Sequence, residues 1–130
     1  MLKNSVIVVG LHHVSLLVMD TGKALDFYQG ILGLERDESR PDLGYPGAWL
    51  NLGDGRQIHL LELPNPDGEM ERPEHGGRDR HVALWVTDIQ RLVETLEQRG
   101  ISYTRSKSGR NALFCRDPDQ NAVEFIERNC

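Results

Sequence analysis

The stretch His13-Val14-Ser15-Leu16-Leu17-Val18-Met19-Asp20 reads almost the same as a later stretch, His81-Val82-Ala83-Leu84-Trp85-Val86-Thr87-Asp88. Five of the eight positions are identical, and the two stretches begin 68 residues apart. A second pair, His59-Leu60-Leu61-Glu62 and Glu124-Phe125-Ile126-Glu127, follows in the same order at an offset of 65 residues. Repetition at a nearly constant spacing is typical of a duplicated structural unit. The sequence therefore predicts two copies of one module.

Each copy begins with an alternating strand that leads into a helix. In the strand 13–18, every second side chain shares one face, and the other face carries only Val and Leu. Asp20 and Asp88 follow the two strands and are predicted helix N-caps. Gly33 and Gly100 are the predicted helix ends, where a residue with positive φ is commonly needed.

Short strand-like runs separated by turn residues follow each helix, at 48–52, 57–63, 112–115 and 122–126. Residues 64–80 are rich in Pro, Gly and charge and show no periodicity, so they are the predicted linker. We expect an α+β fold with a single domain over residues 1–130. It consists of two βαβββ modules, 10–63 and 81–127, joined by the linker 64–80.

Composition narrows the class of protein. A chain of 130 residues forms one compact domain, and its 20 acidic against 15 basic residues argue against nucleic acid or an anionic membrane as partner. Cys115 and Cys130 do not make a disulfide framework, which favours a reducing, cytoplasmic location. The apolar run Val6–Val9 is too short to span a membrane; an edge strand and an arm that reaches a partner both remain open.

The repeats place a polar residue at the same point of four strands: His13 and His81 on the first strands, His59 and Glu124 on the last. An ionised carboxylate inside an apolar strand is unfavourable unless it is paired or bound to a cation. Three imidazoles and one carboxylate form a nitrogen-rich set that suits Zn²⁺, Ni²⁺, Co²⁺ or Fe²⁺ better than Ca²⁺. The sequence therefore predicts a metal site made by these four residues.

Each ligand taken alone has a simpler interpretation. A single strand histidine is more often a core or surface residue, and Glu124 could pair with an arginine; the correspondence of all four positions favours the metal site. His12 competes with His13 but is expected on the opposite face, and His75 in the linker has no counterpart in the repeat.

Several motifs together resemble the vicinal oxygen chelate superfamily, which includes glyoxalase I, fosfomycin-resistance thiol transferases and extradiol dioxygenases. The matching stretches cover about residues 10 to 127: Leu11-His12-His13-Val14, Phe27-Tyr28 with Leu32-Gly33-Leu34, His81-Val82-Ala83-Leu84, and Asp117-Pro118-Asp119-Gln120-Asn121 leading to Glu124. The resemblance implies paired modules that form a cup-shaped mixed sheet around one divalent metal ion (Zn, Ni, Fe, Co or Mn). The family's ligand positions map onto the same four residues.

Three positions depart from the family pattern. Glyoxalase I enzymes usually carry Glu where this chain has His59, and the family often has Gly where Gln120 stands, so some strain is expected in that turn. Leu17 occupies the place where similar bacterial enzymes commonly have an arginine for the carboxylate of glutathione.

The resemblance implies a metal-dependent lyase or isomerase of the glyoxalase I kind that acts on a small vicinal-oxygen substrate, with Glu124 as ligand and base. His13, His81 and Glu124 also match the two-His-one-carboxylate triad of Fe(II) oxygenases, so a dioxygenase is an alternative. A fosfomycin-type thiol transferase is another alternative. A non-catalytic antibiotic-binding protein, as in bleomycin resistance, ranks last because such proteins normally lack the ligands.

Substrate contacts are expected from Trp85, which shares a strand face with His81, and from Lys107 and Arg110. The basic cluster around these last two is either a clamp for a substrate carboxylate or phosphate, or a solvated loop. Trp49 is expected to serve packing. Because each module offers only two ligands, we expect a symmetric homodimer with metal sites at the subunit interface, as in the enzymes that the chain resembles.

Overall fold

The structure is a computed structural model that describes residues 5–128. Cys130 lies outside the described residues. The elements in chain order are β1 (His13–Val18), α1 (Thr21–Leu25), the π-helical segment η1 (Asp26–Ile31), β2 (Glu35–Arg36), β3 (Gly47–Asn51), β4 (Gln57–Glu62), the 3₁₀ turn η2 (Gly76–Arg78), β5 (His81–Val86), α2 (Ile89–Gln98), β6 (Tyr103–Arg105), β7 (Ala112–Arg116) and β8 (Ala122–Glu127).

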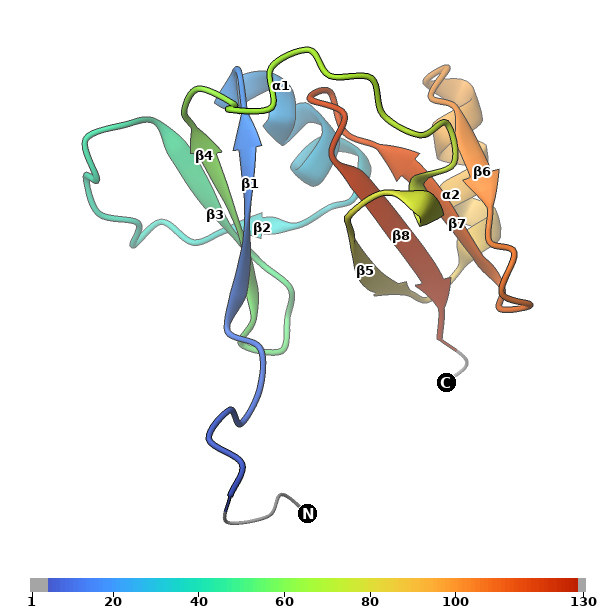
Figure 1. Ribbon diagram of the computed structural model, residues 1–130, viewed down its shortest axis with the longest axis horizontal. Coiled ribbons are helices and arrows are strands. Elements are labelled where there is room, and N and C mark those ends of the chain that lie inside the picture. The colour runs from blue at the N-terminus through green and yellow to red at the C-terminus, as the bar shows by residue number, and fades with distance from the viewer. Residues whose placement is uncertain (1–4, 129–130) are drawn as a thin grey trace.

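Two four-stranded mixed sheets of the same topology form the molecule (Figure 1). The strand order is β1-β4-β3-β2 in the first sheet and β5-β8-β7-β6 in the second. In each sheet the first strand runs parallel to the last one and forms an edge, and the other pairs are antiparallel. The predicted α+β fold of two βαβββ modules is therefore confirmed.

Local signals in the sequence set the helix boundaries. Asp20 accepts a hydrogen bond from the backbone N–H of Lys23, and Asp88 does the same for Arg91, so both are N-caps. Gly33 and Gly100 adopt φ of 75° and 67°, the left-handed conformation that ends a helix. The first helix differs from expectation because it changes from α to π geometry at residue 26.

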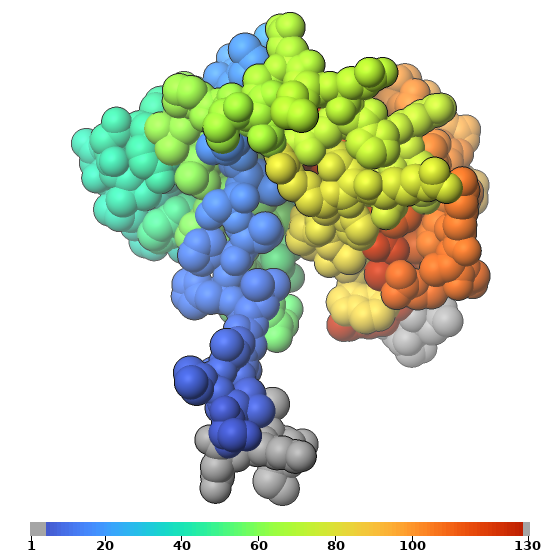
Figure 2. All heavy atoms as spheres, in the orientation of Figure 1, coloured from blue at the N-terminus to red at the C-terminus, as the bar shows by residue number. Residues whose placement is uncertain are grey.

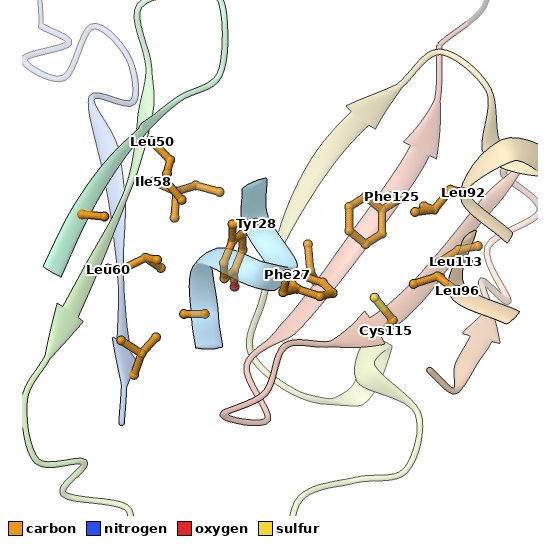
Figure 3. Packing of buried hydrophobic residues seen from close by; sticks show 14 of the residues in the cluster. Phe27, Tyr28, Leu50, Ile58, Leu60, Leu92, Leu96, Leu113, Cys115 and Phe125 are labelled. Carbon is orange, nitrogen blue, oxygen red and sulfur yellow. The ribbon is translucent and has the colours of Figure 1, made fainter. Parts of the chain in front are cut away.

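One hydrophobic core joins the two modules. α1 and η1 lie between the sheets, and the adjacent aromatic residues Phe27 and Tyr28 are both buried there (Figure 3). Leu50, Ile58 and Leu60 face them from the first sheet. On the second sheet, α2 covers the outer side with the helical stripe Ile89, Leu92, Val93 and Leu96.

A buried polar contact connects the modules beside this core. The hydroxyl of Tyr28 donates a 2.8 Å hydrogen bond to Asp117 Oδ2, which belongs to the turn between β7 and β8. Burial raises the pKa of Asp117, although hydrogen bonds from Asn121 and Tyr28 act in the opposite direction. From the same turn, Asn121 donates to the carbonyl of Leu17. The turn thereby attaches the second module to the end of β1.

Removing the Tyr28 hydroxyl should destabilise the protein. Tyr28→Phe leaves a buried carboxylate short of one donor, and a hydrogen bond to a charged group contributes roughly 1.5–3 kcal/mol. Urea denaturation at pH 7 measures this loss. Tyr103→Phe is the control, because its hydroxyl makes only an exposed 3.4 Å contact with Glu97. Equal stability of the two variants would contradict the role assigned to the Tyr28–Asp117 bond.

The backbone at Gln120 has the unusual conformation that the sequence led us to expect. Gln120 adopts φ of 69° and is the one non-glycine residue of positive φ among residues 5–128, so the strain expected in its turn is present.

Residues 5–10 form no strand and stand away from the body, with Ile7 93% exposed (Figure 2). Of the two interpretations for this segment, the edge strand is wrong. In the part of the chain described, no helix is long and apolar enough to cross a bilayer.

Candidate metal centre

Strand register brings the predicted ligands onto the same face of each sheet in two pairs. In the first sheet, Ser15 is the register partner of His59. His13 lies two residues before Ser15 on β1, so its side chain is on the same face of the sheet as that of His59. In the second sheet, Ala83 is the partner of Glu124, and His81 takes the place equivalent to His13. The two sheets thus carry the same arrangement, with His59 replaced by Glu124.

His13 and His59 stack on each other. Their ring centroids are 4.0 Å apart at 18°, and Trp49 stacks on the other side of His59 at 4.6 Å and 13°. Burial lowers the pKa of His59, and electrostatic interaction with His13, His12 and Arg40 lowers it further, whereas Asp37 acts in the opposite direction. The environment therefore favours the neutral imidazole, the form that binds a metal ion.

His81 and Glu124 are in direct contact on the second sheet. His81 Nε2 lies 3.3 Å from Glu124 Oε1. Glu124 is 3% exposed, and its Oε2 is buried without a hydrogen-bond partner; the guanidinium of Arg110 is 3.7 Å away. The other ring nitrogen of His81, Nδ1, lies 2.9 Å from the carbonyl oxygen of Asp79. Because a carbonyl only accepts, Nδ1 carries the hydrogen and neutral His81 keeps its lone pair on Nε2.

These contacts fit a divalent cation. A buried carboxylate oxygen without a partner is unfavourable, and a bound cation would satisfy it. A histidine whose second nitrogen donates to a carbonyl is the usual arrangement of a metal ligand. Within residues 5–128 of one chain, however, no three His, Cys, Asp or Glu side chains come close enough to hold a metal ion. Each sheet therefore brings together two of the four predicted ligands, His13 with His59 and His81 with Glu124.

Two aromatic residues beside the ligands were not assigned to the site from sequence. Trp49 contacts His59, and Phe114 meets the ring of His81 edge-on at 5.0 Å. They are register partners of His59 and Glu124 respectively, and they lie 65 residues apart, the offset of the second sequence repeat. That spacing is the signal that could have placed Trp49 at the site instead of in general packing.

The expected substrate residues are only partly near the ligands. Arg110 reaches Glu124, whereas Lys107 is exposed in the same loop between β6 and β7. Trp85 is 61% exposed, with the Arg128 guanidinium 5.0 Å from its ring centroid. Between β1, the linker and the start of β5 lies a cavity of about 430 Å³, which His81 lines but the other three predicted ligands do not.

The remaining histidines and the buried cysteine have local explanations. His12 does not stay apart from His13 as expected, since their Nδ1 atoms are 2.8 Å apart. His75 contacts the hydroxyl of Thr104 at 2.6 Å. Burial raises the pKa of the Cys115 thiol to about 12, which keeps it protonated and unreactive.

A family model described as the Glyoxalase/Bleomycin resistance protein/Dioxygenase superfamily matches residues 10–125. The chain belongs to this superfamily. Its members include enzymes, bind small molecules and typically use divalent metal ions.

Individual relatives of the superfamily cover nearly the whole chain. The chain is 34% identical to lactoylglutathione lyase of Haemophilus influenzae, over 88% of this chain and 90% of the relative. It is 31% identical to "Glyoxylase I 4" of Arabidopsis thaliana, over 92% of this chain and 70% of the relative. The crystal structure of the fosfomycin resistance protein FosX from Listeria monocytogenes superposes with a TM-score of 0.71 at 21% identity, covering 95% of this chain and 96% of that one. The last similarity concerns the fold alone.

Proposed function

We propose that this protein is a metal-dependent lyase or isomerase of the glyoxalase I kind, acting on a small vicinal-oxygen substrate. The observation that carries the proposal is Glu124, a buried carboxylate with one oxygen beside His81 and the other without a hydrogen-bond partner. The relatives named lactoylglutathione lyase support the reaction class. A divalent metal ion bound here would supply Lewis-acid stabilisation of the negative charge that develops on a substrate oxygen.

Two copies of the chain would complete the ligand set. His13 and His59 of one copy would join His81 and Glu124 of the other, because each pair occupies its own sheet. A twofold axis then generates two equal sites, and C₂ dimers are the commonest oligomers. β1 and β5, the strands that begin with His13 and His81, are both edge strands, so within the described residues neither pairs with a further strand on its outer side.

Each residue of the proposed site would have its own role in binding or catalysis. Glu124 is the one carboxylate of the ligand set, so it would both ligate and move the substrate proton. Arg110, 3.7 Å from Glu124 and mostly exposed, would attract an anionic substrate group, with Lys107 adding positive charge to the same loop. Trp85 would form an apolar wall further along the face of β5.

His59 and Leu17 influence which substrates the proposed site would bind. A histidine in place of a second carboxylate makes the site more cationic, which favours an anionic substrate oxygen and removes a second candidate base. Leu17 lies on the same strand face as His13 and offers no charge for a carboxylate. We therefore propose a small vicinal-oxygen substrate and leave glutathione as one arm of the test.

Loading metal-free protein separately with Ni²⁺, Zn²⁺ and Fe²⁺ tests the proposal. Turnover of a glutathione hemithioacetal, or of a small α-hydroxy carbonyl, with Ni²⁺ or Zn²⁺ is the expected result. Oxygen consumption with Fe²⁺ and a catechol would instead show that the protein is a dioxygenase. Addition of a thiol to fosfomycin would identify a thiol transferase. Binding of bleomycin without turnover would identify a protein that sequesters the antibiotic. Inactivity in all arms would contradict the proposed function.

A further inference from the structure

We propose that Gln57 is a positioning residue which, held by Asp37 and Asn51, fixes the tautomer of His59 so that Nδ1 keeps the lone pair for a metal ion. The inference rests on the proposed function in one respect, the role of His59 as a ligand. The tautomer itself follows from the hydrogen bonds of this chain alone.

Asp37 is the fixed end of the chain of hydrogen bonds. Its Oδ1 accepts from the backbone N–H of Ser39 at 2.9 Å and from the Ser39 hydroxyl at 2.6 Å. These bonds, together with one from Gln57, hold the pKa of Asp37 below its usual range, so the side chain is a carboxylate at neutral pH. A carboxylate has no hydrogen to donate.

Gln57 therefore has a defined orientation. Its Nε2 lies 2.9 Å from Asp37 Oδ2 and 2.9 Å from Asn51 Oδ1, so both amide hydrogens are donated there. The oxygen Oε1 then faces His59 Nε2 at 2.8 Å. An amide oxygen only accepts, so His59 Nε2 must carry the hydrogen. Neutral His59 consequently has its lone pair on Nδ1.

The arrangement is what a metal ligand requires from its surroundings. Ligating histidines almost always donate their second ring nitrogen to an acceptor that fixes the tautomer and the ring orientation. His81 has such an acceptor in the carbonyl of Asp79, and Gln57 is the counterpart for His59. Trp49 and His13 fix the ring plane of His59 by stacking, whereas Gln57 selects which nitrogen carries the hydrogen.

Asp37→Asn should reverse the tautomer. The backbone N–H of Ser39 keeps the remaining oxygen of residue 37 at the Oδ1 position, so the new amide nitrogen faces Gln57. The Gln57 amide then turns its oxygen toward residue 37 and its nitrogen toward His59, and the Asn51 amide turns with it so that its nitrogen donates to the Gln57 oxygen. His59 Nε2 becomes an acceptor, and the hydrogen moves to Nδ1, where it blocks metal binding.

Two further variants separate this effect from the change in charge. Asp54→Asn removes the same charge from an equivalent turn, in which Asp54 Oδ1 accepts from the backbone N–H of Arg56 at 2.9 Å. The double variant Asp37→Asn/Gln57→Glu exchanges amide and carboxylate and leaves the net charge unchanged. Its carboxylate accepts from both residue 37 and His59 Nε2, so the original tautomer should return.

Long-range ¹H–¹⁵N correlation spectra of the metal-free protein at pH 8 identify the nitrogen that carries the hydrogen, with His59→Gln assigning the signal. We expect hydrogen on Nε2 in the wild type, in Asp54→Asn and in the double variant, and on Nδ1 in Asp37→Asn. Titration with Ni²⁺ or Zn²⁺ should show about 10- to 100-fold weaker binding for Asp37→Asn alone, the usual loss when a metal ligand loses its positioning partner.

An unchanged tautomer in Asp37→Asn, or hydrogen on Nδ1 in the wild type, would overturn the positioning role of Gln57. A reversed tautomer with metal affinity equal to that of Asp54→Asn would overturn the link to metal binding. If the wild type bound no metal at all, the proposed function and this link would fail together, while the spectra would still report whether Gln57 fixes the tautomer.

Discussion

Glu124→Gln chains should hold no stoichiometric metal and should lose at least about 1000-fold in turnover, since loss of a general base alone costs roughly 10²–10⁴-fold. Gln has nearly the size of Glu, so the side chain still fills its buried place between His81 and Phe114. It lacks the charge that a cation needs and cannot take up the substrate proton. Metal analysis of the purified variant and steady-state kinetics are the measurements.

The control for this variant lies on the same strand. Glu127 points to the opposite face of β8 from Glu124 by alternation, and its Oε1 accepts from the backbone N–H of Ile89 at the start of α2. Glu127→Gln should keep full metal occupancy. Undiminished occupancy in Glu124→Gln, or an equal loss in both variants, would remove Glu124 from the site.

Mixing His13→Ala chains with Glu124→Ala chains should restore about a quarter of the wild-type metal sites, although each variant alone binds none. In a heterodimer with shared sites, one site carries both substitutions and the other carries neither. Half of the dimers in an equal mixture are heterodimers with one intact site of two, which gives this fraction for free exchange of subunits. Metal content after unfolding and refolding the mixture together is the readout.

A site formed within one chain predicts a different outcome. Every chain in the mixture then carries one damaged ligand, so no combination restores binding. Light scattering that shows a monomer, or a mixture that exchanges subunits and regains no metal, would contradict the shared site. Mixing His13→Ala with His59→Ala chains is the matched control, because both substitutions fall in the same module and every site remains damaged.

Much of the fold could be predicted from local patterns. The repeated strands, the caps Asp20 and Asp88 and the end residues Gly33 and Gly100 depend on hydrogen bonds between near neighbours or on the φ angle of one residue, so the sequence shows them directly. The unusual turn at Gln120 was expected for a different reason, because the family that the chain resembles often has Gly at this position. The short strands β2 and β6 were not located, because two or three residues are too few to show an alternation.

The candidate ligands were also selected from sequence, because strand alternation and the repeat offset place His13, His59, His81 and Glu124 at equivalent points without any knowledge of the three-dimensional structure. The sequence also predicted that each module carries two of them, and only the tertiary structure decided which contacts the side chains make within each pair. Pairing of β1 with β4 and of β5 with β8 brings together residues more than 40 positions apart in the chain, so that His59 stacks on His13 and Glu124 contacts His81. The tertiary structure likewise places Asp37, Gln57 and His59 in one chain of hydrogen bonds. A hydrogen bond between side chains depends on distances below about 3.5 Å and on the orientation of each amide, and no periodicity in the sequence carries that information.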